Sequence, residues 1–249
     1  MVTETPSTID PAWEWLRAGG PDGGVVIADT QTRGRGRLGR RWASPEGGLW
    51  LSLIARPDLP VEHAGRLGIL VALAAAGATR EATGAPAQVK WPNDIVLEGR
   101  KLGGVLVETE LAQGTVAAAV LSLGLNVNVS LDRLPAEMRE SATSLFEATG
   151  RAYRLDSLAA RVLDHLESAW PLLYAAESGL VEKWQQLDAL GGEQVIVIVS
   201  VSGRPTSAGE MEARGVNAGI DETGALVLMT SAGPQRITSG EVRSLRAAA

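Results

Sequence analysis

Apolar residues repeat with two different periods along most of the chain. Short apolar runs that are rich in β-branched residues or bounded by glycine predict strands at residues 25–28, 49–55 and 116–125. Apolar residues that recur every three or four positions predict a helix at 63–83 and mostly helical structure at 157–187. Strands and long helices in one region indicate an α/β body in which helices cover a sheet.

The pattern changes after Gly192. Short β-branched runs separated by glycine-containing turns predict strands at residues 195–201 and 237–242, among others. A series of short strands of this kind is typical of a small β-barrel. We therefore predict a larger domain at residues 1–190 and a small β-barrel domain at residues 191–249.

Composition narrows the class of protein. The chain has 249 residues, a formal net charge of −6 and no cysteine, so disulfides and thiolate metal sites are excluded and general affinity for nucleic acid is not expected. The N-terminus lacks the basic and then apolar pattern of a signal peptide, and we expect no apolar run long enough to cross a membrane. His63 and His165 lie too far apart in sequence to suggest a local metal pair. These features favour a cytoplasmic enzyme or binding protein.

The most unusual stretch is residues 33–42, which reads Arg-Gly-Arg-Gly-Arg-Leu-Gly-Arg-Arg-Trp. Five arginines and three glycines within ten positions leave no apolar face for a core. Arginine presents a permanently charged fork that matches phosphate and carboxylate oxygens, and glycine lets the backbone approach a ligand closely. We interpret the segment as an ordered loop that binds a small, multiply charged anion.

Four different interpretations of this segment fit the residues less well. Gly34, Gly36 and Gly39 form the Gly-x-Gly-x-x-Gly fingerprint of dinucleotide sites, but that fingerprint needs a helix after it, and the following residues read as a turn and a strand. A P-loop would end in Gly-Lys-Ser or Gly-Lys-Thr, which is absent. Arg-Gly segments that bind RNA usually form long repeats in basic, disordered chains. The plainest of the four interpretations is a run of charged side chains that contacts only solvent.

Two polar blocks follow the long helix. Residues 90–94 read Lys-Trp-Pro-Asn-Asp between apolar flanks, and a buried turn that carries an amide and a carboxylate needs polar partners. Lys101 stands just before Gly103 and Gly104, where a ligand could lie against bare backbone. A structural turn and a surface hairpin lysine are the plainer interpretations. We favour a ligand site for both blocks.

Two pairs of polar residues have less certain roles. Asn126 and Asn128 alternate at a strand end and so point to one face, where they either bind a sugar or phosphate or close an edge. Ser7 and Thr8 precede a predicted helix near residues 11–18. They either cap that helix or contact a ligand.

Taken together, these blocks occur in the order and spacing of the biotin–protein ligase family, which the chain resembles over nearly its whole length. The blocks are Gln31 with residues 34–42, residues 90–94, Lys101 to Gly104, and Gly124 to Asn128. The resemblance implies an α+β fold, with a mixed β-sheet catalytic domain flanked by helices and a small SH3-like β-barrel C-terminal domain. It also implies an ATP-dependent ligase. Biotin's carboxylate attacks the α-phosphate of ATP to give biotinyl-5′-adenylate, and a carrier lysine then displaces AMP.

The resemblance assigns roles to individual residues. The expected catalytic residues are Lys101, which bridges the carboxylate and the α-phosphate, Arg37, and Asp94, which receives a proton from the incoming lysine or orients its ammonium group. The expected biotin-binding residues are Ser7, Thr8, Gln31, Gly34, Arg35, Gly36, Arg37, Lys101, Gly104 and Leu106. The expected residues for ATP and the adenylate are Arg37, Arg40, Trp42, Lys101, Asn126 and Asn128. Residues 130–150 are expected to form a loop over the adenine, and Mg²⁺ is expected to arrive mainly on the nucleotide.

The N-terminus departs from the family pattern. The family usually has asparagine where this chain has Ile9, so one polar contact is missing. Because only six residues precede Ser7, the strand that normally comes first is expected to be nearly absent. No helix-turn-helix segment precedes the catalytic part, so the resemblance points to the non-regulatory type of ligase that does not bind DNA.

The expected partner is the biotin carboxyl carrier protein domain of an acyl-CoA carboxylase, with no DNA and no membrane. An unpaired sheet edge would also allow a side-by-side homodimer. The second hypothesis is a lipoate–protein ligase-like enzyme, against which the Arg-Gly loop and the Lys-Trp-Pro-Asn-Asp block favour biotin. A third is a non-catalytic biotinyl-adenylate binding protein, with Ile9 as the feature in its favour, and a fourth is a nucleic-acid-binding module.

Overall fold

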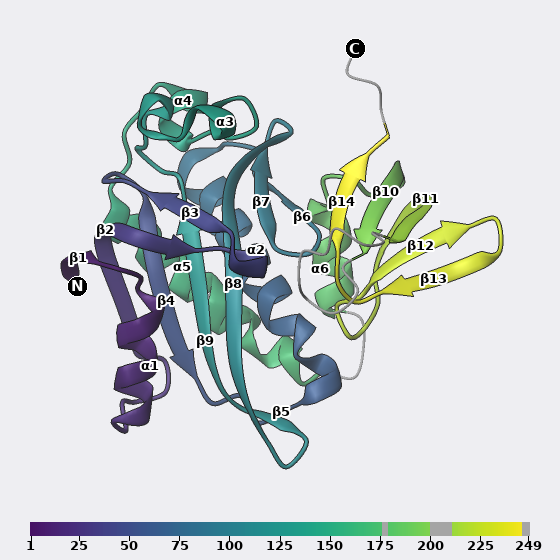
Figure 1. Cartoon of the computed structure of the whole chain (residues 1–249), viewed down its shortest axis with the longest axis horizontal. Coiled ribbons are helices and arrows are strands. Elements are labelled where there is room, and N and C mark those ends of the chain that lie inside the picture. The colour runs from purple at the N-terminus through teal and green to yellow at the C-terminus, as the bar shows by residue number, and fades with distance from the viewer. Residues whose placement is uncertain (176–178, 200–210, 246–249) are drawn as a thin grey trace.

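The structure is a computed structural model that describes residues 1–175, 179–199 and 211–245 (Figure 1). Its larger part is a nine-stranded mixed sheet with the strand order β1-β2-β4-β9-β8-β7-β6, in which β3 pairs with β2 and β5 pairs with β9. Strands β1 and β2 run parallel, and the other pairs are antiparallel. The strands of this sheet are β1 (Val2–Thr5), β2 (Val25–Arg35), β3 (Arg41–Ser44), β4 (Leu49–Ala55), β5 (Leu59–Pro60), β6 (Gln88–Lys90), β7 (Asp94–Leu97), β8 (Arg100–Ala112) and β9 (Thr115–Leu125).

Helices cover both faces of this sheet. The α-helices of the described chain are α1 (Ile9–Arg17), α2 (Gly65–Thr83), α3 (Ala136–Arg139), α4 (Leu145–Thr149), α5 (Leu155–Ala169) and α6 (Gly179–Leu187). Helix α1 packs on one face against Ile54 and Val120, whereas α2 packs on the other face with Leu53 and Leu121. Side chains alternate between faces along a strand, so a strand covered on both sides reads as a continuous apolar run. This explains why every residue of β4 is buried.

Helix α2 is the central helix of the larger part. Among the described residues, one helical stretch, Val61–Thr83, is long and apolar enough to cross a membrane by length and composition, with a mean hydropathy of 1.3. Within this stretch, Arg66 and Arg80 bound the uncharged run at residues 67–79. Of the most apolar window, 61% is buried inside the protein, where α2 packs against the sheet and against α5. Apolarity on all sides is what a helix enclosed in a core requires.

The remaining strands form a five-stranded antiparallel sheet with the order β13-β12-β11-β10-β14, shown beside the larger part in Figure 1. These strands are β10 (Gln194–Val199), β11 (Met211–Ile220), β12 (Leu226–Thr230), β13 (Gly233–Ile237) and β14 (Glu241–Ser244). The mixed sheet, its flanking helices and this second sheet confirm the predicted α+β class.

The turn between β11 and β12 attaches the second sheet to the larger part. Trp91 Nε1 donates a hydrogen bond to the carbonyl oxygen of Gly224 at 3.0 Å. The buried guanidinium of Arg66 donates to the carbonyl oxygens of Glu222 and, at 2.8 Å, of Leu173. A Cβ atom on Gly65 would lie 2.9 Å from the carbonyl oxygen of Thr223, so this turn approaches the start of α2 as closely as the backbone allows.

Several boundaries differ from those predicted. Strand β1 is present and pairs with β2, so the expectation that the first strand is nearly absent is wrong. Strand β2 runs on to Arg35, well past the predicted end at residue 28, because β1 and β3 pair with its second half. The strand predicted at 237–242 is two strands, since a turn separates Ile237 of β13 from Val242 of β14. The last two residues of the strand predicted at 195–201 lie outside the described residues.

Candidate active site

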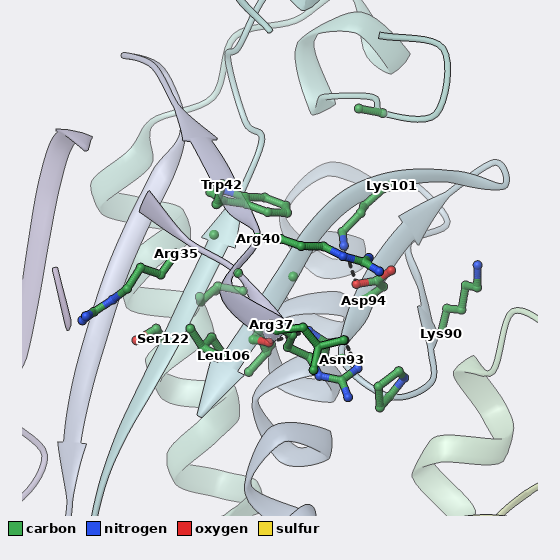
Figure 2. Close-up of a pocket in the computed structure, with 18 of the residues that line it drawn as sticks. Arg35, Arg37, Arg40, Trp42, Lys90, Asn93, Asp94, Lys101, Leu106 and Ser122 are labelled. Carbon is green, nitrogen blue, oxygen red and sulfur yellow. Dashed lines mark hydrogen bonds and ion pairs between the residues drawn. The ribbon is translucent and has the colours of Figure 1, made fainter. Parts of the chain in front are cut away.

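A cavity of about 550 Å³ lies between one face of the larger sheet and residues of the second sheet. Figure 2 shows side chains that line it. That volume falls in the range of sites for small molecules. Strands β2, β8 and β9 and the turn before β7 supply its floor and walls, and Leu134, Met138 and Ala142 line it from the segment that follows β9. The start of β14 completes the wall with Gly240 and Glu241.

One end of the cavity carries neutral hydrogen-bonding groups. Gln31 Oε1 accepts hydrogen bonds from Thr8 N at 2.8 Å and from the Thr8 hydroxyl at 3.2 Å, while Gln31 Nε2 donates to the Ser44 hydroxyl at 2.7 Å. The Thr8 hydroxyl also lies 2.7 Å from Ser52 Oγ, which lies 2.8 Å from Ser122 Oγ.

Thr8 occupies the position before the first turn of α1, but its side chain makes no capping hydrogen bond. The Thr8 hydroxyl is therefore committed to this polar end rather than to the helix.

The indole of Trp42 lies over two glycines in the middle of the cavity floor. Gly104 on β8 and Gly124 on β9 are directly opposite in the sheet register. A Cβ atom on Gly124 would lie 2.7 Å from Trp42 Nε1, and one on Gly104 would lie 3.6 Å from the Trp42 ring. The two glycines thus leave the space that the indole fills. Trp42 Nε1 is buried and has no hydrogen-bond partner among the described residues.

A charged cluster forms the opposite end. Lys101 Nζ lies 2.6 Å from Asp94 Oδ1 and 5.2 Å from the centre of the Trp42 ring. Figure 2 shows the side chains of Arg40, Lys101 and Asp94 converging beside the cavity. The register of β7 and β8, in which Asp94 pairs with Gly104, brings the Lys-Trp-Pro-Asn-Asp block to Lys101.

The neighbouring Asn93 is fixed by the backbone. Its amide nitrogen donates to the carbonyl oxygen of Val105 at 2.6 Å, and its Oδ1 accepts from Arg37 Nη1 at 3.4 Å. The predicted turn therefore has its polar partners, but Asn93 and Asp94 are half-buried rather than buried.

The arginines of the Arg-Gly loop point in different directions. Arg37 Nη1 lies 3.3 Å from the carbonyl oxygen of Gly240, and burial lowers the pKa of the Arg37 guanidinium from its ordinary value. Arg40 Nη2 donates to Glu241 Oε2 at 2.9 Å, which lowers the pKa of the Glu241 carboxyl and raises that of Arg40. Arg35 points away from Lys101 in Figure 2 and pairs with Asp10 Oδ1 at 2.8 Å. Arg37 and Arg40 thus supply positive charge near Lys101. They also connect the Arg-Gly loop to the start of β14 through Gly240 and Glu241.

Asn126 and Asn128 have different environments. Asn126 is 3% exposed and lines the cavity, and its Nδ2 donates to the carbonyl oxygen of Thr143 at 3.0 Å. Its Oδ1 is buried without a hydrogen-bond partner among the described residues. Asn128 Nδ2 donates a hydrogen bond to the carbonyl oxygen of Tyr153 at 2.8 Å, and Asn128 Oδ1 accepts one from Tyr153 N at 2.9 Å. Asn128 is not among the described residues that line the cavity.

The structure brings most of the predicted site residues to one cavity. The described lining includes Ser7, Thr8, Gln31, Arg35, Gly36, Arg37, Arg40, Trp42, Asp94, Lys101, Gly104, Leu106 and Asn126. Gly34 and Asn128 are the predicted residues that do not line it. A Cβ atom on Gly34 would lie 2.5 Å from the carbonyl oxygen of Trp42, so the close approach of β2 and β3 requires glycine at this position.

Sequence reasoning missed three residues of this region. Ser52 and Ser122 each interrupt an apolar strand, and a lone hydroxyl inside such a run is a signal that a polar partner exists. Glu241 lies too far from Arg40 along the chain for any local signal to connect them. Among the described residues, no group of three or more histidine, aspartate or glutamate side chains is placed to hold a metal ion.

Comparisons with known proteins agree with this arrangement. Residues 2–126 match the Biotin/lipoate A/B protein ligase family, and residues 201–243 match the Biotin protein ligase C terminal domain. The chain is 32% identical over 252 aligned residues to a biotin–[acetyl-CoA-carboxylase] ligase of Paracoccus denitrificans, covering 97% of this chain and 98% of that protein. It is 33% identical to a bifunctional ligase/repressor BirA of Bacillus spizizenii, covering 95% of this chain and 70% of that protein.

Solved structures give the same result. The biotin protein ligase from Aquifex aeolicus in complex with biotin and ATP superposes with a TM-score of 0.82 at 29% identity, covering 98% of this chain and 97% of that chain. The family match spans half of the sequence, and the relatives align over nearly all of it. This chain belongs to the biotin–protein ligase family.

Proposed function

We propose that the protein joins biotin to a lysine of a biotin carboxyl carrier domain in two ATP-dependent steps. The observation that carries this proposal is one cavity with two chemically different ends. Neutral donors and acceptors around Gln31 suit the ureido ring of biotin, and the cations Arg37, Arg40 and Lys101 suit a carboxylate and a phosphate chain. Biotin and ATP are the ligands named for the similar Aquifex aeolicus protein.

In the first step, the biotin carboxylate attacks the α-phosphate of ATP and pyrophosphate leaves. Two anions approach each other in this step, and negative charge builds on the phosphoryl oxygens, so fixed cations lower the barrier. Lys101 would bridge the two anions, because its ammonium group lines the cavity beside Trp42 and Asp94. Arg37 and Arg40 would bind the phosphates, and Mg²⁺ would enter on the triphosphate.

In the second step, the carrier lysine attacks the acyl carbon of the adenylate and AMP leaves. An amine attacks only in its neutral form, so a carboxylate near the acyl carbon assists by taking its proton or by orienting the ammonium. Asp94 would take this role once Lys101 turns from it to the phosphate. Trp42 and the segment at 134–142 would cover the adenylate and exclude water, which would otherwise hydrolyse it.

The site residues follow from this assignment. Ser7, Thr8, Gln31 and Leu106 bind biotin, and Asn126 accepts a hydrogen bond from the nucleotide. We assign no ligand contact to Gly34 or Asn128, because neither is among the described residues that line the cavity. We assign catalysis to residues 1–190 and assign residues 191–249 to a small domain that completes the cavity wall through Glu241.

The partner and the assembly are further parts of the proposal. The carrier is the biotin domain of an acyl-CoA carboxylase, a proposal supported by the Paracoccus denitrificans relative, whose name gives acetyl-CoA carboxylase as its substrate. A homodimer remains a prediction. Strands β1 and β6 end the larger sheet and are the edges through which two copies would pair.

The test is mass spectrometry of a purified carrier domain after incubation with the protein, biotin, ATP and Mg²⁺. We expect a mass gain of one biotinyl group that disappears without ATP and with Lys101→Ala. Lys183→Ala is the matched control, because Lys183 lies on α6 outside the cavity and the variant should retain activity. A carrier modified with lipoate but not with biotin would replace this proposal with a lipoate–protein ligase activity.

A further inference from the structure

Four buried or half-buried polar side chains form a continuous hydrogen-bonded series beneath the neutral end of the cavity. We call Gln31, Thr8, Ser52 and Ser122 the hydroxyl chain. Ser52 and Ser122 are directly opposite in the register of β4 and β9, and they are 0% and 9% exposed. Their hydroxyl oxygens are 2.8 Å apart, and Thr8 Oγ1 is 2.7 Å from Ser52 Oγ. Ser122 alone of the two serines lines the cavity.

The direction of the protons along the hydroxyl chain is set at Gln31. Gln31 Oε1 accepts from the backbone N–H of Thr8 at 2.8 Å, which fixes the orientation of the amide because a backbone N–H can only donate. An amide oxygen has no proton, so the Thr8 hydroxyl at 3.2 Å must donate to it.

Each remaining hydroxyl has one proton to give. With the Thr8 proton committed to Gln31, Ser52 donates to Thr8 and Ser122 donates to Ser52. The Ser122 hydroxyl therefore turns only lone pairs toward the cavity. The sheet thus presents a hydrogen-bond acceptor at a position where a lone serine would be free to donate or to accept.

Ser7 provides the complementary group. Its hydroxyl accepts a weak hydrogen bond from Ile9 N at 3.4 Å, and no acceptor for its own proton is found among the described residues. The second hydrogen of Gln31 Nε2 likewise has no acceptor within the described part of the chain, since one hydrogen goes to Ser44. The neutral end therefore offers donors at Ser7 and Gln31 and an acceptor at Ser122.

We infer that Ser122 accepts a hydrogen bond from a ureido N–H of biotin and that Ser52 holds it in this state. A cyclic urea carries one carbonyl oxygen and two N–H groups, which matches the donors and the acceptor of the neutral end. The dithiolane ring of lipoate has neither group, so it would leave the buried Ser122 and Ser7 groups unpaired. Ser122 is thus a specificity-determining residue, and Ser52 is a positioning residue that contacts no ligand. This inference rests on the proposed function.

The test measures binding by isothermal titration calorimetry without ATP. The probes are biotin, biotin methylated at one or the other ureido nitrogen, and lipoate. The proteins are the wild type, Ser122→Ala, Ser52→Ala and the double variant. Thr79→Ala is the matched control, because Thr79 is a fully buried hydroxyl on α2 whose hydrogen bond to Ala75 lies outside the cavity.

We expect Ser122→Ala to weaken biotin binding about 3- to 10-fold, the usual effect of losing one hydrogen bond. The same substitution should not change the affinity for the one methylated biotin whose blocked nitrogen faces Ser122. Ser52→Ala should also weaken biotin binding, and the double variant should lose no more than the larger single loss, because both substitutions remove one hydrogen bond. The KM for biotin should rise in these variants while kcat stays unchanged.

An equal loss for biotin and for both methylated biotins would overturn the inference, since Ser122 would then act by packing alone. Unchanged biotin affinity in Ser122→Ala would overturn it as well, while leaving the proposed function intact. A wild-type protein that binds no biotin would instead overturn the proposed function and the inference with it.

Discussion

The substitution Asp94→Asn separates the two half-reactions. Asp94 Oδ1 lies 2.6 Å from Lys101 Nζ and neutralises the lysine that the first step needs for its anions. Asparagine has the same shape and keeps an oxygen that can accept from Lys101, but it removes the charge and the basic group. We expect ATP to bind more tightly and carrier transfer to slow, while adenylate formation stays within a few-fold of wild type.

The size of each effect follows from the exposure of the pair. The side chains of Lys101 and Asp94 are 37% and 23% exposed, so water screens much of their attraction. A partly exposed ion pair contributes about 1 kcal/mol, and its loss should tighten ATP binding about fivefold because Lys101 no longer has to leave a counterion. Removal of a general base should slow the transfer step by about 10²- to 10⁴-fold.

The assay measures the two steps separately. Pyrophosphate release with hydroxylamine as the acceptor reports adenylate formation, and biotin transfer to the carrier domain reports the second step. Asp156→Asn is the charge-matched control, because Asp156 is an exposed carboxylate paired with Arg154 and is not among the residues that line the cavity. An equal slowing of both steps in Asp94→Asn would refute the reasoning, since Asp94 would then be needed for a structure that both steps share.

Three further predictions concern the cavity floor and the contact between the two sheets. Gly124→Ala places a Cβ 2.7 Å from Trp42 Nε1, so the indole must move, and overpacking of about 1–3 kcal/mol should raise the KM for ATP about tenfold in steady-state kinetics. Trp91→Phe removes the 3.0 Å hydrogen bond to Gly224 and leaves a buried carbonyl unpaired, which should cost about 2 kcal/mol and lower Tm by about 4–8 °C in calorimetry. Burial raises the pKa of Asp188, so the folded protein holds that proton more tightly than the unfolded chain does, and the contribution of Asp188 to the free energy of unfolding should fall as pH rises from about 3.9 through the raised folded pKa. In Asp188→Asn, the free energy of unfolding measured with urea should therefore have a more positive slope against pH than in the wild type. An unchanged slope, an unchanged Tm or an unchanged KM would contradict the corresponding prediction.

The elements with local signals were predictable from the sequence. The apolar period predicted α2 to within two residues of its start, and Gly84 ends it in the left-handed conformation that favours glycine. The composition of the Arg-Gly loop and of the Lys-Trp-Pro-Asn-Asp block placed both at the cavity, because charge and amide groups flanked by apolar residues need partners.

The pairing of distant segments was not predictable in this way. Ser52 and Ser122 meet only because β4 and β9 pair in one register, and a shift of one strand by one residue would place the two hydroxyls on opposite faces of the sheet. The alternation of Asn126 and Asn128 predicted one shared face, but the chain leaves the strand after Leu125, and Asn128 turns to the backbone of Tyr153. Register and strand ends depend on contacts across the fold rather than on neighbouring residues.

The contact between the Arg-Gly loop and β14 can form only late in the synthesis of the chain. Arg40 and Glu241 are separated by 201 positions, and Arg37 contacts Gly240 across 203. During translation, the larger sheet can therefore form while the wall supplied by β14 is still inside the ribosome. A nascent chain in that state would have the biotin end of its cavity and an open phosphate end. Any acyl phosphate formed there would meet water, so the order of synthesis itself delays activity until the last wall of the site has emerged.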